Sequence, residues 1–288
     1  IRLRSDVPVG VLLSSGLDST LVSTLIKKEL KKNITAYTVS FDKKFDESKQ
    51  ASLIAKYLGI QHKVYKYTED FPSQEDLLLN IYGMPNDNLT AIPIKLISKI
   101  MKKNVKVVLS GIGGDELCFG YNKYRFINSN YYYFKLPKSI RKLLGLFKGL
   151  KIEKLDKALY YIDGSDSWRM IAIKNGESFA SLKNKFVKLK IEIENEHNND
   201  FLINVKNFDL KQTLPFSYLP SIDRGSMREG LEVRTPFLCK ELFEKVALLK
   251  QKELLKGNKV LFRKILRRYL PNELLNTQKV GFINPNTP

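Results

Sequence analysis

Hydrophobic and polar positions in the first third of the chain follow two alternating periods. Short runs rich in β-branched residues, typical of buried strands, occupy residues 7–13, 34–41, 62–67 and 105–109. Between them, apolar side chains recur at helical spacing over residues 17–30, 46–58 and 92–101. This alternation predicts βα units, which the right-handed crossover rule assembles into one doubly wound parallel sheet.

The pattern changes beyond Tyr121. Strand signals fade there, and the spacing predicts helices over residues 139–150, 183–196, 241–249 and 260–269. We therefore expect an α/β protein, with its sheet within residues 1–125 and a mainly helical part over residues 126–288 that completes the site. Ligands of such sheets bind at the carboxyl ends of the strands, so the loops after Leu13 and Leu109 are the first places to look for chemistry.

Composition narrows the class of protein. The 288 residues, 43% hydrophobic and 27% charged, are enough for one large domain or two small ones and exclude disorder of the whole chain. No apolar run approaches the roughly 20 residues of a membrane span. Two cysteines, Cys118 and Cys239, and two histidines exclude a disulfide scaffold and a His-built zinc site, so we expect buried, inert thiols in a reduced, cytoplasmic setting.

The chain is strongly basic. Its net charge of +19, from 49 basic and 30 acidic residues, would attract nucleic acid, anionic lipid or phosphorylated ligands. The lysines are spread along the chain, however, which favours solvated helix ends over a nucleic-acid surface. Since the chain opens with Ile1 and shows no signal peptide, we expect a fragment of a longer protein.

The first loop, residues 12–20, reads Leu-Leu-Ser-Ser-Gly-Leu-Asp-Ser-Thr where a predicted strand gives way to a helix. Free backbone N–H groups and the helix dipole make such a terminus an anion site. Hydroxyl donors from Ser14, Ser15 and Ser19 exceed what a helix cap needs, and Gly16 permits a tight turn. Asp18 would repel a phosphate unless a divalent cation lay between them, so it predicts magnesium.

The second loop, residues 109–117, reads Leu-Ser-Gly-Ile-Gly-Gly-Asp-Glu-Leu after another buried strand. It is not a dinucleotide fingerprint, because Glu116 stands where the third glycine belongs, and no P-loop motif occurs in the chain. Two such loops at one sheet edge could hold one Mg²⁺ through Asp18 and Asp115 and present the phosphates of ATP between them. Glu116 would then be a further ligand or a helix cap.

These motifs resemble those of a known family. The first loop is similar to the S-G-G-x-D-S pyrophosphate loop of N-type ATP pyrophosphatases. Residues 110–121, 223–227 and 231–238 are similar, in that order, to the asparagine synthetase signatures S-G-E-G-x-D-E-L-F-G-G-Y, D-R-x-S-M and L-E-x-R-x-P-F-L-D. The resemblance runs from Val7 to at least Lys259, and the chain looks like the synthetase half of a glutamine-dependent asparagine synthetase.

The resemblance implies a reaction and a set of site residues. ATP adenylates a side-chain carboxylate, pyrophosphate leaves, and ammonia attacks the acyl-adenylate to give an amide, most simply asparagine from aspartate. Residues 1–125 would be the nucleotide-binding core, and Lys259 matches the family's catalytic lysine, with an exposed turn lysine as the alternative. The resemblance assigns the adenine to Leu12, Val39 and Ser40, the ribose to Gly111, and a charged framework around the crevice to Arg224, Glu232 and Arg234.

Departures from the family pattern leave the carboxylate open. Ile112 stands where a glutamate is usual, and isoleucine cannot accept a proton. Ser15 replaces a glycine in the first loop, and Cys118 and Phe119 replace the usual Phe-Gly in the second. Cys239 replaces the Asp that follows P-F-L. These changes keep open an amidotransferase acting on another carboxylate, such as a sugar acid or a peptide.

Other readings remain. A tRNA-modifying enzyme could share the first loop, and a non-catalytic member could retain nucleotide binding alone. Glutamine-dependent members begin with a cysteine nucleophile, and none lies near Ile1, so we expect this chain to take ammonia from a glutaminase domain of the full-length protein or from solution. The sequence predicts no oligomeric state.

Overall fold

The computed structural model describes residues 3–40, 46–66, 73–84, 88, 90–136, 140 and 200–275. The helices predicted over residues 139–150 and 183–196 lie outside these residues, apart from Ile140. The chain forms two compact units, one of residues 1–120 with 213–288 and one of residues 121–212. The C-terminal residues therefore belong to the same unit as the sheet.

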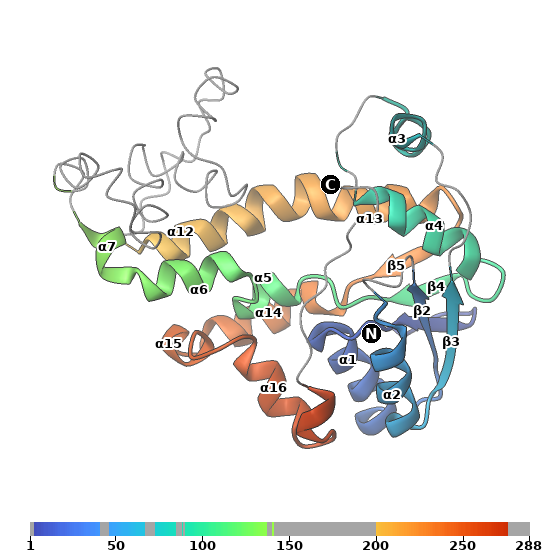
Figure 1. The fold of residues 1–288 in the computed structure, drawn as a ribbon, viewed down its shortest axis with the longest axis horizontal. Helices are drawn as coiled ribbons and strands as arrows, with labels where there is room; N and C mark the ends of the chain where they lie inside the picture. The colour runs from blue at the N-terminus through green and yellow to red at the C-terminus, as the bar shows by residue number, and fades with distance from the viewer. Residues whose placement is uncertain are drawn as a thin grey trace. The chain divides into compact units, whose positions relative to one another are not determined.

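The first unit contains a parallel five-stranded sheet in the order β3-β2-β1-β4-β5 (Figure 1), which confirms the predicted fold class. Its strands are β1 (Val9–Leu12), β2 (Thr35–Ser40), β3 (Gln61–Lys66), β4 (Val107–Leu109) and β5 (Glu232–Arg234). β1 lies at the centre, where Val11 is opposite Ala36 of β2 and Leu109 of β4. The loops after β1 and β4 thus leave the same edge of the sheet from adjacent strands.

Helices cover both faces of this sheet. Successive strand residues point to opposite faces, and Tyr37 packs in a cluster with Ile97 and Met101 of α4 (Ala91–Met101). Its neighbour Thr38 contacts His62, which in turn contacts Ser52 of α2 (Ser48–Leu58), on the opposite face. The alternating pattern along β2 therefore buries one face under each helix.

The remaining predicted helices of the first unit are present with shifted ends. They are α1 (Leu17–Thr24), which continues as the π-helix η1 (Leu25–Glu29), α14 (Lys240–Ala247) and α16 (Val260–Leu266). The unit also contains α3 (Gln74–Tyr82), α5 (Gly114–Cys118), α13 (Leu219–Met227), η5 (Pro236–Leu238), α15 (Gln251–Leu254) and η6 (Asn272–Leu274). None of the described helices is long and apolar enough to cross a membrane.

The prediction that strands end before Tyr121 is wrong at β5. This strand comprises only Glu232, Val233 and Arg234 and pairs in parallel with β4, with Val233 opposite Val108. Three residues, two of them charged, are too short a run to predict a strand, so the pairing with β4 rather than the local pattern makes the strand. Helix α3 was likewise not predicted.

The second unit contains α6 (Asn122–Ser129), α7 (Tyr131–Lys135) and α12 (Phe201–Phe208), followed by the π-helix η4 (Asp209–Tyr218), which runs on into the first unit. Its interior holds a charged pair. Asp209 is fully buried and accepts hydrogen bonds from Lys123 Nζ and Tyr124 Oη, both at 2.6 Å. A buried carboxylate needs such partners, so these contacts hold η4 against α6.

Candidate functional site

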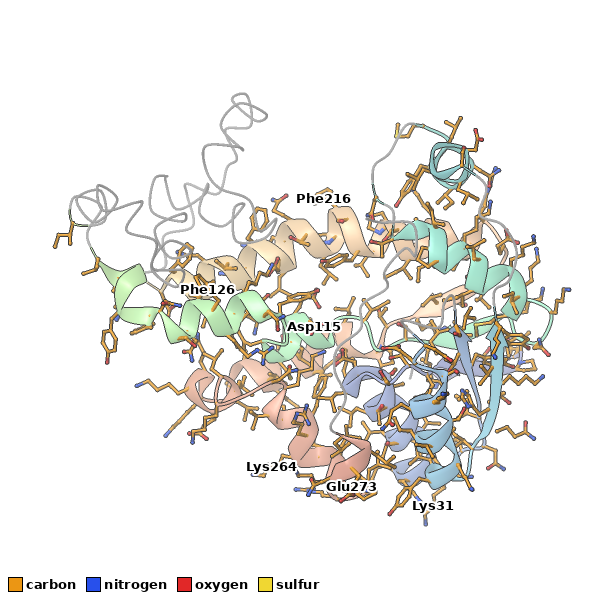
Figure 2. All side chains as sticks on the ribbon, in the orientation of Figure 1. Lys31, Asp115, Phe126, Phe216, Lys264 and Glu273 are labelled. Atoms are coloured by element: carbon orange, nitrogen blue, oxygen red, sulfur yellow. The ribbon has the colours of Figure 1, made fainter. Side chains whose placement is uncertain are left out.

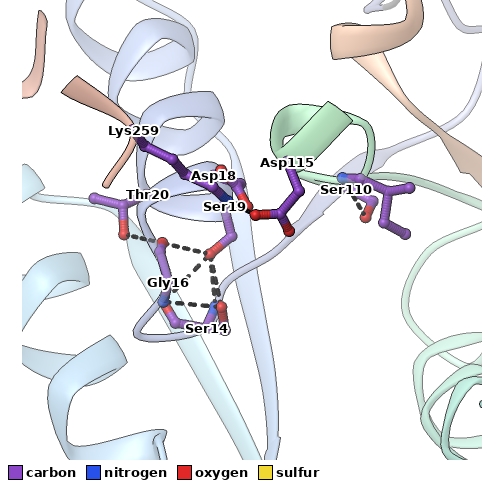
Figure 3. Close-up of polar contacts among 9 residues, drawn as sticks. Ser14, Gly16, Asp18, Ser19, Thr20, Ser110, Asp115 and Lys259 are labelled. Carbon is purple, nitrogen blue, oxygen red and sulfur yellow. Dashed lines mark hydrogen bonds and ion pairs between the residues drawn. The ribbon is translucent and has the colours of Figure 1, made fainter. Parts of the chain in front are cut away.

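The segment of residues 14–19, here called the serine loop, follows β1 and includes the first turn of α1, where a strand-to-helix loop was predicted. Its hydroxyls brace the turn: Ser14 Oγ lies 2.9 Å from Ser19 Oγ, and the Gly16 N–H donates to Ser14 Oγ at 3.1 Å (Figure 3). Thr20 Oγ1 donates to the Gly16 carbonyl at 2.8 Å. The loop thereby holds a fixed shape at the N-terminus of an eight-residue helix, where backbone N–H groups attract anions.

The loop of residues 110–120, here called the glycine loop, packs directly against the serine loop. A Cβ on Gly111 would lie 2.6 Å from the Ser19 backbone nitrogen, and one on Gly114 would lie 2.7 Å from Asp18 Oδ1. Gly113 has φ of 91°, which favours glycine in its own right. The glycines of this motif therefore bring the two loops into contact at the sheet edge.

Lys259 lies where the two loops meet. Its side chain is 4% exposed, and Nζ donates to Asp18 Oδ2 and lies 2.7 Å from Asp115 Oδ1 (Figure 3). Burial alone would lower the pKa of Lys259, but the two carboxylates outweigh it and raise the pKa, so the ammonium form is favoured. The interpretation of Lys259 as an exposed turn lysine is therefore wrong.

The backbone around Lys259 is adapted to this position. Lys259 precedes α16 in the left-handed conformation, with φ of 49°, which is uncommon for a residue with a side chain. Gly120 lies against the pair, because a Cβ there would clash with both Asp115 Oδ1 and Lys259 Cε. By contrast, Lys31 and Lys264 are exposed at the edge of the unit (Figure 2), like the solvated lysines expected from the sequence.

The donor set around Lys259 is suited to a hard cation. Asp18 and Asp115 offer carboxylate oxygens, and Mg²⁺ is commonly bound by one or two carboxylates together with phosphate oxygens and water. Among the described residues, no group of three or more His, Cys, Asp or Glu side chains gathers into a metal site. A magnesium ion here would therefore depend on oxygens that a ligand supplies.

The residues predicted to hold the nucleotide lie at the ends of adjacent strands. Leu12 of β1 and Val39 of β2 pack against the cluster around Tyr37, and Ser40 ends β2 with 7% exposure. Ser15 is also buried, but its hydroxyl donates to Glu47 Oε1 at 2.8 Å. The sequence analysis does not single out Glu47, although the adjacent acids Asp46 and Glu47 begin the helix predicted over residues 46–58.

The predicted charged framework makes contacts that join elements. Arg234 pairs with Glu232 on β5 at 2.7 Å and donates to the Arg4 carbonyl at 2.7 Å. Arg224 of α13 donates to the Tyr82 carbonyl at the end of α3 at 3.2 Å. These bonds tie β5 to the chain before β1 and tie α13 to α3.

The unusual residues of the two signatures have different environments. Cys118 is buried with 1% exposure, as expected for an inert thiol. Cys239 is only half-buried and its Sγ contacts Glu241 Oε2 at 2.5 Å, so the expectation of burial is wrong for this cysteine. Ile112 lies in the glycine loop, where its N–H donates to Ser110 Oγ at 3.4 Å, and Glu116 is buried on α5.

Comparison with known proteins gives the family. The chain is 28% identical to glutamine-hydrolyzing asparagine synthetase 1 of Bacillus subtilis, over 99% of this chain and 48% of that protein. It is 33% identical to a putative asparagine synthetase of Methanocaldococcus jannaschii, over 79% of this chain and 46% of that protein. The chain thus spans about half the length of these relatives.

A solved structure, the U34-tRNA thiolase NcsA from Methanococcus maripaludis, is 16% identical with a TM-score of 0.31, covering 88% of this chain and 82% of that one, a likeness too weak to bear on function. The asparagine synthase family matches residues 1–287. With a match over nearly its whole length, the chain belongs to the asparagine synthase family.

Proposed function

We propose that this chain is an ATP-dependent amide ligase that converts a carboxylate and ammonia into an amide, with AMP and pyrophosphate as the other products. The observation that carries the proposal is the ammonium of Lys259 held by Asp18 and Asp115 where the serine and glycine loops meet. Family membership supports the same reaction class, and L-aspartate is the first substrate to test.

The serine loop would bind the pyrophosphate portion of ATP. The first backbone N–H groups of α1 have no acceptor within the helix, and the helix dipole adds about half a positive charge there. The hydroxyls of Ser14 and Ser19 hold the turn, so these donors are oriented before the ligand arrives. The adenine would lie by Leu12, Val39 and Ser40, with the ribose near Gly111.

Charge compensation would come from three side chains. Asp18 and Asp115 would hold Mg²⁺, which when bound offsets the negative charge of the pyrophosphate leaving group. The Lys259 ammonium would stabilise the charge that develops at the α-phosphate when a carboxylate oxygen attacks it and the bond to the β-phosphate breaks. Burial strengthens that stabilisation, because Lys259 is 4% exposed.

The second step joins nitrogen to carbon. Ammonia attacks the acyl carbon, the bond from that carbon to the AMP oxygen breaks so that AMP leaves, and the nitrogen loses a proton to solvent. Ile112 cannot accept that proton, which favours a carboxylate other than free aspartate as a second candidate, such as a uronic acid. Because the relatives are named glutamine-hydrolyzing and this chain spans half their length, we propose that ammonia comes from a glutaminase domain or partner.

Pyrophosphate release tests the proposal. The protein would be given Mg²⁺, ATP and ammonium with L-aspartate, with a panel of uronic acids, or with no acceptor, and the amide would be identified by mass spectrometry. Release that depends on one acceptor, with the matching amide and AMP, is the expected result. Asp115→Asn should abolish it. A wild-type protein that binds ATP but releases pyrophosphate with none of these acceptors would contradict the proposal.

A further inference from the structure

Glu47 lies in the connection between β2 and α2, and its side chain contacts the serine loop. It is the residue before α2, where its carbonyl accepts from the Ala51 N–H at 3.0 Å. Its side chain is half-buried and accepts the Ser15 hydroxyl at 2.8 Å. Burial raises the pKa of Glu47, and hydrogen bonds from the Ser15 side chain and backbone oppose that rise. The hydrogen bond from the Ser15 hydroxyl thus joins Glu47 to the serine loop.

The preceding residue makes a matching contact with the next strand. Asp46 Oδ1 accepts the Ser48 N–H at 2.9 Å at the start of α2. Burial acts to raise the pKa of Asp46, but hydrogen bonds from Ser48 and from the Ser40 side chain outweigh it and lower that pKa. Two adjacent acids therefore lie beside Ser15 of the serine loop and beside Ser40 at the end of β2.

A carboxyl group beside a phosphate-binding loop needs an explanation, because like charges repel. Glu47 does not donate to an anion, since an ionised carboxylate only accepts hydrogen bonds. What it does is occupy the Ser15 side chain, which is 6% exposed and stands at a loop position where the resembled motif has glycine. Fixing Ser15 fixes the turn between Ser14 and Gly16, whose N–H donates to Ser14 Oγ and so helps to brace the loop.

We propose that Glu47 is a positioning residue that holds Ser15 and thereby keeps the serine loop in the shape that binds the pyrophosphate group of ATP. The proposal rests on the proposed function for the identity of the ligand. A preorganised loop gives up less conformational freedom on binding, so the effect falls on affinity for phosphates and not on the chemical step.

Inorganic pyrophosphate and Mg·ATP are the probes, with binding measured by calorimetry. Glu47→Ala should weaken binding of both by about tenfold, the worth of a hydrogen bond to a charged group. Glu47→Gln keeps a carbonyl acceptor for Ser15 and should stay within about threefold of wild type. In turnover, Glu47→Ala should raise the KM for ATP by a similar factor and leave kcat within about twofold.

A double-mutant cycle with Ser15→Ala separates positioning from general structure. If Glu47 acts through Ser15, the change Glu47→Ala costs much less affinity in the Ser15→Ala background than alone. Glu229→Ala is the matched control, since it removes another largely buried carboxylate, 12% exposed and paired with Lys102, and should lower stability without changing pyrophosphate affinity. Should Glu47→Ala not fold, Ser15→Ala and Glu47→Gln carry the test.

The outcomes discriminate between the two proposals. The positioning role alone would be overturned if wild type bound pyrophosphate tightly and folded Glu47→Ala bound it equally well. If Glu47→Ala does not fold, unchanged binding by Ser15→Ala would overturn it in the same way. Equal losses from Glu47→Ala in both backgrounds would also overturn it. A wild-type protein that binds neither pyrophosphate nor ATP would overturn the proposed function together with this inference.

Discussion

Lys259→Met removes the ammonium but keeps most of the side-chain volume, and leaves Asp18 and Asp115 facing each other. Breaking a buried ion pair by removing one partner costs about 3–5 kcal/mol. The carboxylates are 20% and 15% exposed, so water relieves part of that cost, and we expect a loss of about 2–4 kcal/mol. Against a total stability of about 5–15 kcal/mol, such a loss is readily measured by urea unfolding.

Magnesium should compensate for the missing ammonium. In wild type the Lys259 ammonium compensates one of the two negative charges and contacts an oxygen of each carboxylate, so Mg²⁺ without nucleotide should add little stability. In Lys259→Met no ammonium competes with the ion for these oxygens, and at ten times its Kd the gain would be about 1.4 kcal/mol. The assay is urea unfolding at pH 7.5 with and without Mg²⁺, at ionic strength matched with NaCl.

Lys259→Met combined with Asp115→Asn is the control. It removes one of the two facing charges, so both the destabilisation and the response to Mg²⁺ should shrink. The reasoning would be refuted if Lys259→Met were as stable as wild type, or if Mg²⁺ stabilised wild type and the variant equally.

Three further predictions concern packing, pH and the second unit. Gly111→Ala places a Cβ against the backbone of the serine loop, so we expect it to lower the free energy of unfolding in urea by about 1–3 kcal/mol. It should also weaken ATP binding at least tenfold, and unchanged affinity would contradict the packing of the two loops. Burial lowers the pKa of His62, so the unfolded chain binds a proton on this side chain more readily than the folded chain does. The contribution of His62 to stability should be full above about pH 7 and should fall as the pH drops through about 6.5. Urea midpoints at pH 7.5 and 5.5 measure this dependence, and His62→Gln should weaken it. Tyr124→Phe removes the hydroxyl that donates to buried Asp209 and should lower the free energy of unfolding by about 1–3 kcal/mol. The control Tyr132→Phe, at an 85% exposed position, should lower it by less than about 0.5 kcal/mol. Equal losses would argue against the buried hydrogen bond.

The sequence predicts the sheet edge because its signals are local. Runs of β-branched residues predict β1 to β4, and serines or glycines directly after a strand indicate each of the two loops. Two loops on adjacent parallel strands must meet at one edge, so the proximity of Asp18 and Asp115 follows from topology.

Long-range pairing explains what the sequence does not predict. The resemblance singles out Lys259, but no local pattern predicts its burial, which depends on a carboxylate 241 residues away. The contact of Glu47 with Ser15 spans 32 residues, and it forms because α2 returns alongside β2. β5 is a strand only because β4 offers an open edge.

The most direct test of the account follows an oxygen atom through the reaction. The protein is given Mg²⁺, ATP, ammonium and the carboxylate that supports pyrophosphate release, labelled with oxygen-18 in its carboxyl group, and the products are analysed by mass spectrometry. Attack of the carboxylate on the α-phosphate predicts AMP that carries one labelled oxygen, together with the amide. Unlabelled AMP, or the formation of ADP and phosphate in its place, would contradict an acyl-adenylate and with it the proposed role of Lys259.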